Sequence, residues 1–137
     1  MSGAALFRTL ALLLLASPAL ADDFVQFHTP SANIHCAIST GAWNNLRCDM
    51  FELTPSFPEQ PAWCEFDWGS SFSLDLDGTK GEVACVSDTV ADPTGPVLGY
   101  GERLSLGGFT LSEKTGLTCT NPAGHGFTLS KARQKLF

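Results

Sequence analysis

The sequence is poor in positive charge. Its 137 residues include 8 lysines and arginines against 14 aspartates and glutamates, which gives a formal net charge of −6 at pH 7. A surface of this sign repels phosphate backbones and anionic lipid headgroups. We therefore expect neither a nucleic acid nor a membrane surface as a partner.

A long apolar run occurs only once, near the N-terminus. Arg8 precedes an unbroken apolar stretch from Leu10 to Ala16, and Ala19-Leu20-Ala21 has the small-residue pattern of a cleavage site. The stretch is much shorter than the roughly 20 residues of a membrane-spanning helix. We predict that residues 1–21 are a signal peptide cleaved after Ala21. Residues 22–137 would then form one secreted or periplasmic domain without a membrane anchor.

The chain also lacks the usual signatures of metal and nucleophile sites. No pair of cysteines has the Cys-x-x-Cys spacing of zinc sites. A calcium-binding loop centred on Gly78 would need acidic ligands at its two ends, where Ser73 and Ala84 stand. The Gly-x-Ser-x-Gly motif of hydrolases is missing as well. We predict no metal, no cofactor and no catalytic residue.

Helical periodicity is almost absent, whereas short alternating apolar and polar runs recur between turns rich in Gly, Pro, Asn and Asp. Only the end of the chain, Ser130 to Phe137, fits one short helix, with Ser130 as its N-cap. The pattern predicts an all-β domain, a small disulfide-stapled antiparallel sandwich or barrel. The predicted strands are Phe24–His28, Ile34–Ile38, Leu46–Phe51, Phe72–Leu76, Val83–Cys85, Leu104–Leu111 and Leu117–Thr120.

Five cysteines fall in the predicted mature chain, where an oxidising compartment favours disulfides and the odd number leaves a thiol over. Cys36 and Cys48 have the parity of core-facing residues on neighbouring strands, at a plausible distance for a bridge. Cys64 precedes a turn from which it can close onto Cys85, while other pairings stay open. The cysteines are Cys36, Cys48, Cys64, Cys85 and Cys119.

Several motifs, in this order, resemble a family of short secreted bacterial proteins known as a domain of unknown function with six cysteines. They are Thr29–Cys36, Arg47–Asp49, Cys64–Gly69, Cys85–Thr89, Leu98–Gly101, Gly116–Asn121 and Gly124–Ser130. The resemblance spans nearly all of the predicted mature chain and implies an envelope or secreted location, but no activity.

The same resemblance implies bridges Cys36–Cys48 and Cys64–Cys85. It leaves Cys119 as a free thiol, because Leu111 stands where the family has its sixth cysteine. Two further positions differ from the family, since Ala32 and His35 replace residues that are usually glycine. We expect the Cys119 thiol to be a buried apolar group rather than a nucleophile.

Four residues are candidates for a binding site. His125 lies between two glycines, as does Tyr100, so the backbone at each allows close approach by a ligand. Trp68 is one of three loop tryptophans, which can stack on a sugar or anchor a peptide. Asp88 is the acid of a Ser-His-Asp set that can be assembled with His125 and Ser87 or Ser31. The alternatives are ordinary ones: a hydrogen-bonded turn histidine, a capped turn at Asp88 and tryptophans that cover the ends of the core.

The function that these features favour is a monomeric, non-enzymatic binding or interaction domain with a protein, peptide or glycan ligand. A rigid scaffold, aromatic loops and the missing catalytic spacing motivate this hypothesis. One alternative is a small hydrolase-like enzyme that uses His125 with Asp88 or Tyr100. Another is a structural protein of the cell envelope.

Overall fold

The computed structural model describes residues 23–137, so the predicted signal peptide and its cleavage site lie outside the described residues. Every regular element in this part of the chain is a strand. No helix found there is long and apolar enough to cross a membrane. The strands are β1 (Asp23–His28), β2 (Ile34–Thr40), β3 (Asn45–Met50), β4 (Ser71–Asp75), β5 (Glu82–Val83), β6 (Arg103–Leu106), β7 (Phe109–Glu113), β8 (Leu117–Thr120), β9 (Gly126–Leu129) and β10 (Gln134–Leu136).

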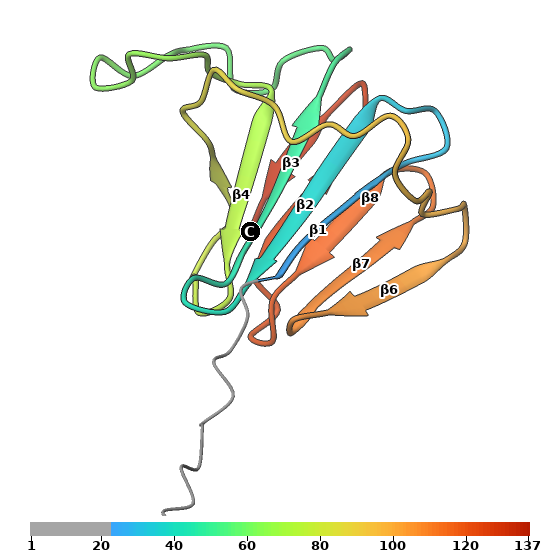
Figure 1. Ribbon diagram of the computed structural model, residues 1–137. Helices are drawn as coiled ribbons and strands as arrows, with labels where there is room; N and C mark the ends of the chain where they lie inside the picture. Colours follow the sequence, from blue (N-terminus) through green and yellow to red (C-terminus); the bar gives the residue numbers. More distant parts are fainter. Residues whose placement is uncertain (1–22) are drawn as a thin grey trace, which may run out of the picture.

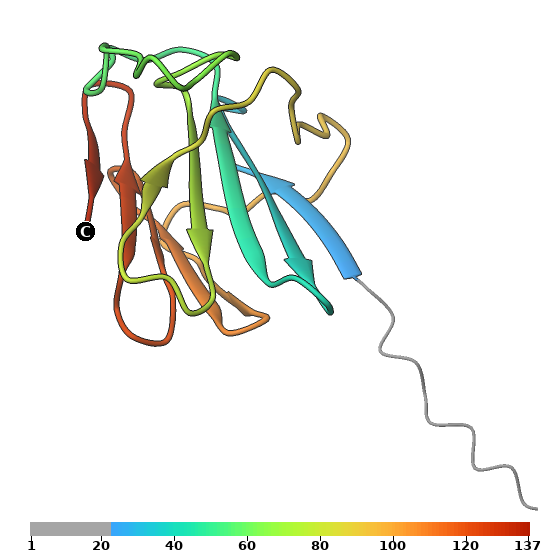
Figure 2. The same ribbon diagram turned by 90° about the vertical axis from the view of Figure 1, so that its left-hand side faces the viewer.

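The strands form two antiparallel five-stranded sheets that pack as a sandwich rather than a closed barrel. One sheet has the order β1-β2-β3-β4-β5 and the other the order β10-β9-β8-β7-β6, so each is a simple meander. Figure 2 shows them as two layers, with the red C-terminal strands on one side and the green and cyan strands on the other. The all-β prediction is confirmed, and of its two alternatives the sandwich is the correct one.

The core lies between the sheets and follows the alternation of the strands. Cys36 and Cys48 are direct partners in the β2–β3 register and form a disulfide, and a second disulfide joins Cys64 to Cys85. In the opposite sheet, Leu111 pairs with Cys119. The fully buried side chains are Cys36, Ile38, Leu46, Cys48, Phe72, Leu74, Phe109, Leu111, Leu117, Cys119, Phe127 and Leu129.

The predicted helix at the C-terminus is wrong. Ser130 and Arg133 exchange backbone hydrogen bonds of 2.9 and 3.2 Å, which closes a tight turn. Gln134 then pairs with Leu129, so the chain returns beside β9 as the strand β10. The Ser130 hydroxyl accepts a hydrogen bond from the Arg133 amide, as in a helix cap. The hydrogen bond that would cap a helix therefore closes a hairpin turn instead, because the edge of β9 can pair with the returning chain.

The predicted single strand from Leu104 to Leu111 is also wrong, because it is a hairpin. Leu106 pairs with Phe109 across a two-residue turn at Gly107 and Gly108. Both glycines have positive φ angles, 61° and 89°. A type I′ hairpin turn requires this conformation at both central residues, and glycine adopts it without a steric penalty.

Residues 84–102 form a long crossing loop between the two sheets. Figure 1 shows this loop passing in front of β3 and β2 before it descends to β6. Along this path Gln26 donates a hydrogen bond to the carbonyl of Val90, and His28 pairs with Val97 at the edge of β1. The loop packs on the outer face of the first sheet at Asp49, which is buried and accepts hydrogen bonds from Thr89 and Val90.

Candidate functional site

The candidate site is a cleft of about 650 Å³ at one end of the sandwich, where the two sheets separate. Turns from both sheets meet there: the β1–β2, β7–β8 and β9–β10 turns, the end of β3 and the end of the crossing loop. The lining includes Ile34 and Leu129, which are buried, and Tyr100 and Phe51, which are exposed. This volume lies within the range of small-ligand pockets.

Glu113 is the unusual residue of the cleft. It ends β7 on the same parity as Phe109 and Leu111, so its side chain points between the sheets, where the strand otherwise places apolar groups. The residue is only 4% exposed, and its Oε2 atom is buried without a hydrogen-bond partner in the described structure. Burial raises the pKa of the Glu113 carboxyl above its ordinary value.

Two exposed aromatic side chains stand at the rim. Tyr100 and Phe51 are 65% and 57% exposed. The ring of Phe51 contacts His35 edge to face, with 5.3 Å between the centroids, and a ring nitrogen of His35 is 3.0 Å from the carbonyl of Ala32. The rim therefore presents apolar rings beside polar turns, the mixture found in ligand sites.

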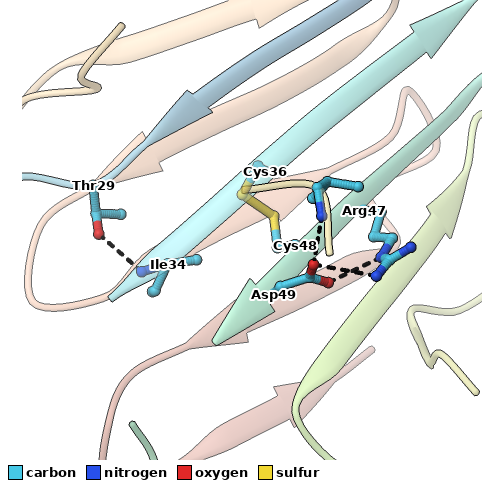
Figure 3. The surroundings of a disulfide bond; sticks show 7 residues. Thr29, Ile34, Cys36, Arg47, Cys48 and Asp49 are labelled. Carbon is cyan, nitrogen blue, oxygen red and sulfur yellow. Dashed lines mark hydrogen bonds and ion pairs between the residues drawn. A yellow bond between two sulfur atoms is a disulfide. The ribbon is translucent and has the colours of Figure 1, made fainter. Parts of the chain in front are cut away.

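The backbone around the cleft is held by local hydrogen bonds. The hydroxyl of Thr29 accepts a 3.3 Å bond from the amide of Ile34, which closes the β1–β2 turn (Figure 3). Asn33 bonds the backbone of Glu52 through both ends of its side-chain amide, at 2.8 and 2.7 Å. The Gly101 amide, next to Tyr100, donates a 2.7 Å bond to the carbonyl of Glu113. Three segments distant in sequence are thereby fixed around one opening.

Asp88, one of the predicted site residues, lies on the outer face of the first sheet and anchors the crossing loop. Its carboxylate accepts a 3.0 Å hydrogen bond from Arg47, which also binds Asp49 at 2.9 Å. The contact with Arg47 lowers the pKa of Asp88. Burial alone would lower the pKa of Arg47, but its hydrogen bonds to both carboxylates outweigh that effect and raise it.

Asp49 is the inner member of this group. It is buried, and its Oδ2 atom also accepts hydrogen bonds from the hydroxyl of Thr89 at 3.1 Å and the amide of Val90 at 2.9 Å. Figure 3 shows Arg47 and Asp49 beside the Cys36–Cys48 bridge. The cluster ties the loop to the sheet and is fully hydrogen-bonded, so it is a structural anchor.

His125 lies at the end of the sandwich opposite to the cleft. It follows β8, whereas Glu113 precedes that strand, so the strand separates the two positions. The His125 amide donates a 3.1 Å hydrogen bond to the side chain of Asn121, whose amide group binds the Gly78 carbonyl at 2.7 Å. The backbone of His125 thus belongs to the turns that close the far end.

Trp68 lies in the loop that connects β3 to β4. Its ring meets that of Trp63 edge to face, with centroids 5.6 Å apart, and its Nε1 atom is buried without a partner in the described residues. Trp63 is exposed. Of the four predicted residues, only Tyr100 lines the cleft, and the structure does not bring Trp68, Asp88 and His125 together with it.

Cys119 is fully buried in the core beside Leu111. Burial, with a further contribution from the charge of Glu113, raises the pKa of its thiol well above the ordinary value. A thiol in this state is a poor nucleophile because the reactive species is the thiolate. Among residues 23–137, no group of three or more His, Cys, Asp and Glu side chains is arranged to hold a metal ion.

The residue that sequence reasoning missed is Glu113. Its signal was present, because Phe109, Leu111 and Glu113 alternate with Thr110 and Ser112 on one strand. A carboxyl at the apolar parity of a strand is unusual and marks either a strand end or a buried acid. The sequence predicted one strand from Leu104 to Leu111, so Glu113 fell in the predicted turn and its inward parity was missed.

Comparison with known proteins identifies a family and nothing further. The model of a family of unknown function (DUF6636) matches residues 6–137. No curated protein and no solved structure matches the chain.

Proposed function

The chain belongs to this family of unknown function, and we propose that it is a binding domain that works outside the cytoplasm and holds its ligand in the cleft at the end of the sandwich. One observation carries the proposal. Glu113 lines the cleft, and one of its carboxyl oxygens is buried without a hydrogen-bond partner in the described structure. Folded proteins pair nearly all buried polar atoms, and a bound ligand is one way to supply the missing partner.

Other features of the cleft support a binding role. The Cys36–Cys48 disulfide joins the two strands that lead to Ile34 and Phe51, and the hydrogen-bonded turns hold the walls in place before any ligand arrives, which lowers the entropic cost of binding. The exposed rings of Tyr100 and Phe51 offer apolar contact area to a ligand. The hydrolase alternative has no such support, because His125 lies at the opposite end of β8 from the Tyr100 side of the molecule.

The proposed location rests on the disulfides and on the predicted signal peptide. Two bridges are compatible with an oxidising compartment such as the periplasm or the extracellular medium. We expect the intact mass of the exported protein to equal that of residues 22–137, with Asp22 as the N-terminus. A cytoplasmic protein that retains residues 1–21 and has reduced cysteines would contradict this location.

Ligand capture tests the binding role. The exported protein is incubated with a cell-envelope extract, recovered and weighed by native mass spectrometry. Thr115→Trp places a large ring in the turn that lines the cleft, and Thr79→Trp makes the same change in an exposed turn outside it. We expect wild type and Thr79→Trp to retain a small added mass and Thr115→Trp to lose it. Retention by all three proteins, or by none, would contradict the proposal.

A further inference from the structure

We infer that the ligand of this cleft presents a primary ammonium group, carried on an apolar or aromatic body, to the carboxylate of Glu113. This inference rests on the proposed binding function and specifies the chemistry of the ligand. It depends on three features of the described residues: an unpartnered buried acid, the lack of an ion pair at that acid, and buried apolar side chains beside exposed aromatic rings.

The first feature favours a hydrogen-bond donor as the partner of the ionised Glu113 carboxylate. An ionised carboxylate accepts hydrogen bonds and donates none, so its partner must carry N–H or O–H groups. Oε2 of Glu113 has no such partner among residues 23–137. An ammonium group supplies three donors and also the positive charge that a buried carboxylate lacks, whereas a hydroxyl group supplies a donor alone.

The second feature is that neither lysine of the cleft lining, Lys114 or Lys131, forms an ion pair with Glu113 in the described structure. The ammonium group of Lys131 is 3.2 Å from the carboxylate of Glu52, and both side chains are largely exposed at the rim. Lys114 is exposed in the β7–β8 turn. No ion pair involves Glu113 in the part of the chain that the structure describes. The Glu113 carboxylate therefore has no counterion within 4 Å among residues 23–137.

The third feature concerns the rest of the ligand. The buried side chains of Ile34 and Leu129 line the cleft together with Glu113. Tyr100 and Phe51 add exposed rings, whose faces attract both apolar groups and cations. An apolar or aromatic body matches these surfaces, and a cleft of about 650 Å³ has room for one of moderate size.

The test compares three probes that share a phenyl group and differ in the polar head: phenethylamine, 2-phenylethanol and 3-phenylpropanoate. Binding to the exported protein is measured by titration, with amide chemical-shift changes in the NMR spectrum locating each probe. We expect phenethylamine to bind at the cleft and more tightly than the other two. A dipeptide amide with an N-terminal phenylalanine, used as a fourth probe, distinguishes a peptide terminus from a free amine as the preferred source.

Two variants connect the binding to Glu113. Glu113→Gln keeps the shape of the side chain and removes its charge, and we expect phenethylamine to bind about tenfold or more weakly to it. Glu82→Gln makes the same change on the exposed strand β5, away from the cleft, and should leave the affinity unchanged. Circular dichroism confirms that both variants are folded.

The outcomes separate this inference from the proposed function. If 2-phenylethanol or 3-phenylpropanoate binds at the cleft as tightly as the amine, the ammonium class is wrong while the cleft remains a binding site. If the amine binds equally well to Glu113→Gln, the assigned role of Glu113 is wrong. If no probe shifts cleft residues, the inference fails, and the ligand-capture experiment alone decides on the proposed function.

Discussion

Strand alternation in β7 places an apolar residue at positions 109 and 111 and a glutamate at position 113. An ionised side chain left unpaired in such a place lowers the stability of the fold. Proteins tolerate such residues where function requires them, at the expense of stability. Under the proposed function, Glu113 therefore lowers the stability of the fold and contributes to ligand binding.

Replacing Glu113 with leucine should stabilise the protein at pH 7. We expect a gain of roughly 1–3 kcal/mol in the free energy of unfolding, the usual penalty of an unsatisfied buried polar group. Urea denaturation of the variant and the wild type measures it. Glu82→Leu on the exposed strand β5 is the control and should change stability by less than about 0.5 kcal/mol.

The gain from Glu113→Leu should also depend on pH, with a definite sign. Below the ordinary glutamate pKa of 4.5 the carboxyl is protonated in both the folded and the unfolded state. As the pH rises through the raised pKa of the folded state, the wild type must bury a charge and loses stability. The advantage of the variant therefore grows from pH 4 to pH 7, and a constant difference would contradict the raised pKa.

Ala32 is the second residue under strain. Its φ angle is 59°, the left-handed region that glycine occupies without penalty, and it is the non-glycine residue with positive φ among residues 23–137. We expect Ala32→Gly to raise the free energy of unfolding by roughly 0.5–1 kcal/mol, since relief of strain outweighs the entropy of the unfolded glycine. Ala132→Gly, in an exposed turn with ordinary φ, should give no gain; an equal gain there would refute the strain argument.

At the scale of elements, the crossing loop connects the two sheets and delivers Tyr100 to the cleft. Polar contacts attach it to the first sheet: Asp49 accepts hydrogen bonds from Thr89 and Val90, and Arg47 forms an ion pair with Asp88. Asp49 thus fixes the middle of the loop, while the backbone of His28 holds its later part through Pro96 and Leu98, next to the rim of the cleft.

Asp49→Ala should be strongly destabilising. It leaves the partly buried Arg47 without its buried carboxylate partner and leaves two donors of the loop, at Thr89 and Val90, unpaired. We expect a loss of roughly 3–5 kcal/mol in the free energy of unfolding. Asp88→Ala removes the exposed partner of the same arginine and should cost less than about 1 kcal/mol. Equal losses in urea denaturation would show that the buried member is not the anchor.

At the scale of the whole molecule, one end of the sandwich is open and the other is closed. The end near Glu113 opens into the cleft, whereas the end near His125 is closed by hydrogen bonds between the β8–β9 and β4–β5 turns. Between these ends lies a core that contains one disulfide and the free thiol of Cys119. The accessibility of that thiol to a labelling reagent therefore indicates whether the core is intact.

Cys119 should react with a maleimide only when the whole domain unfolds. Burial removes access to the thiol and raises its pKa, so the labelling rate in native buffer should follow the rate of global opening. Mass spectrometry of the unreduced protein should show one label and two intact disulfides after unfolding. Thr79→Cys, with an exposed thiol, is the control that should react at once. Rapid labelling of Cys119 in the folded protein would contradict the buried assignment.

Local pattern alone predicted much of this fold. The alternation in Ile34–Ile38 and Leu46–Met50 predicts two strands with cysteines on their inner faces, and the structure pairs Cys36 with Cys48 directly. Such predictions succeed because period-two alternation requires only that one face of a strand is buried. The same logic failed at Ser130, where a helix cap and a hairpin turn share one local hydrogen bond.

The sequence by itself thus determined the β class, the inward faces of several strands and the bridge between Cys36 and Cys48. Only the tertiary structure decided which residues meet at the cleft. Ile34, Glu113 and Leu129 are far apart in the chain, and they converge because the sheets pack face to face and the crossing loop links them at that end. Period-two patterns carry no information about which strand ends coincide in space, so the buried acid at the cleft became visible only in the folded molecule.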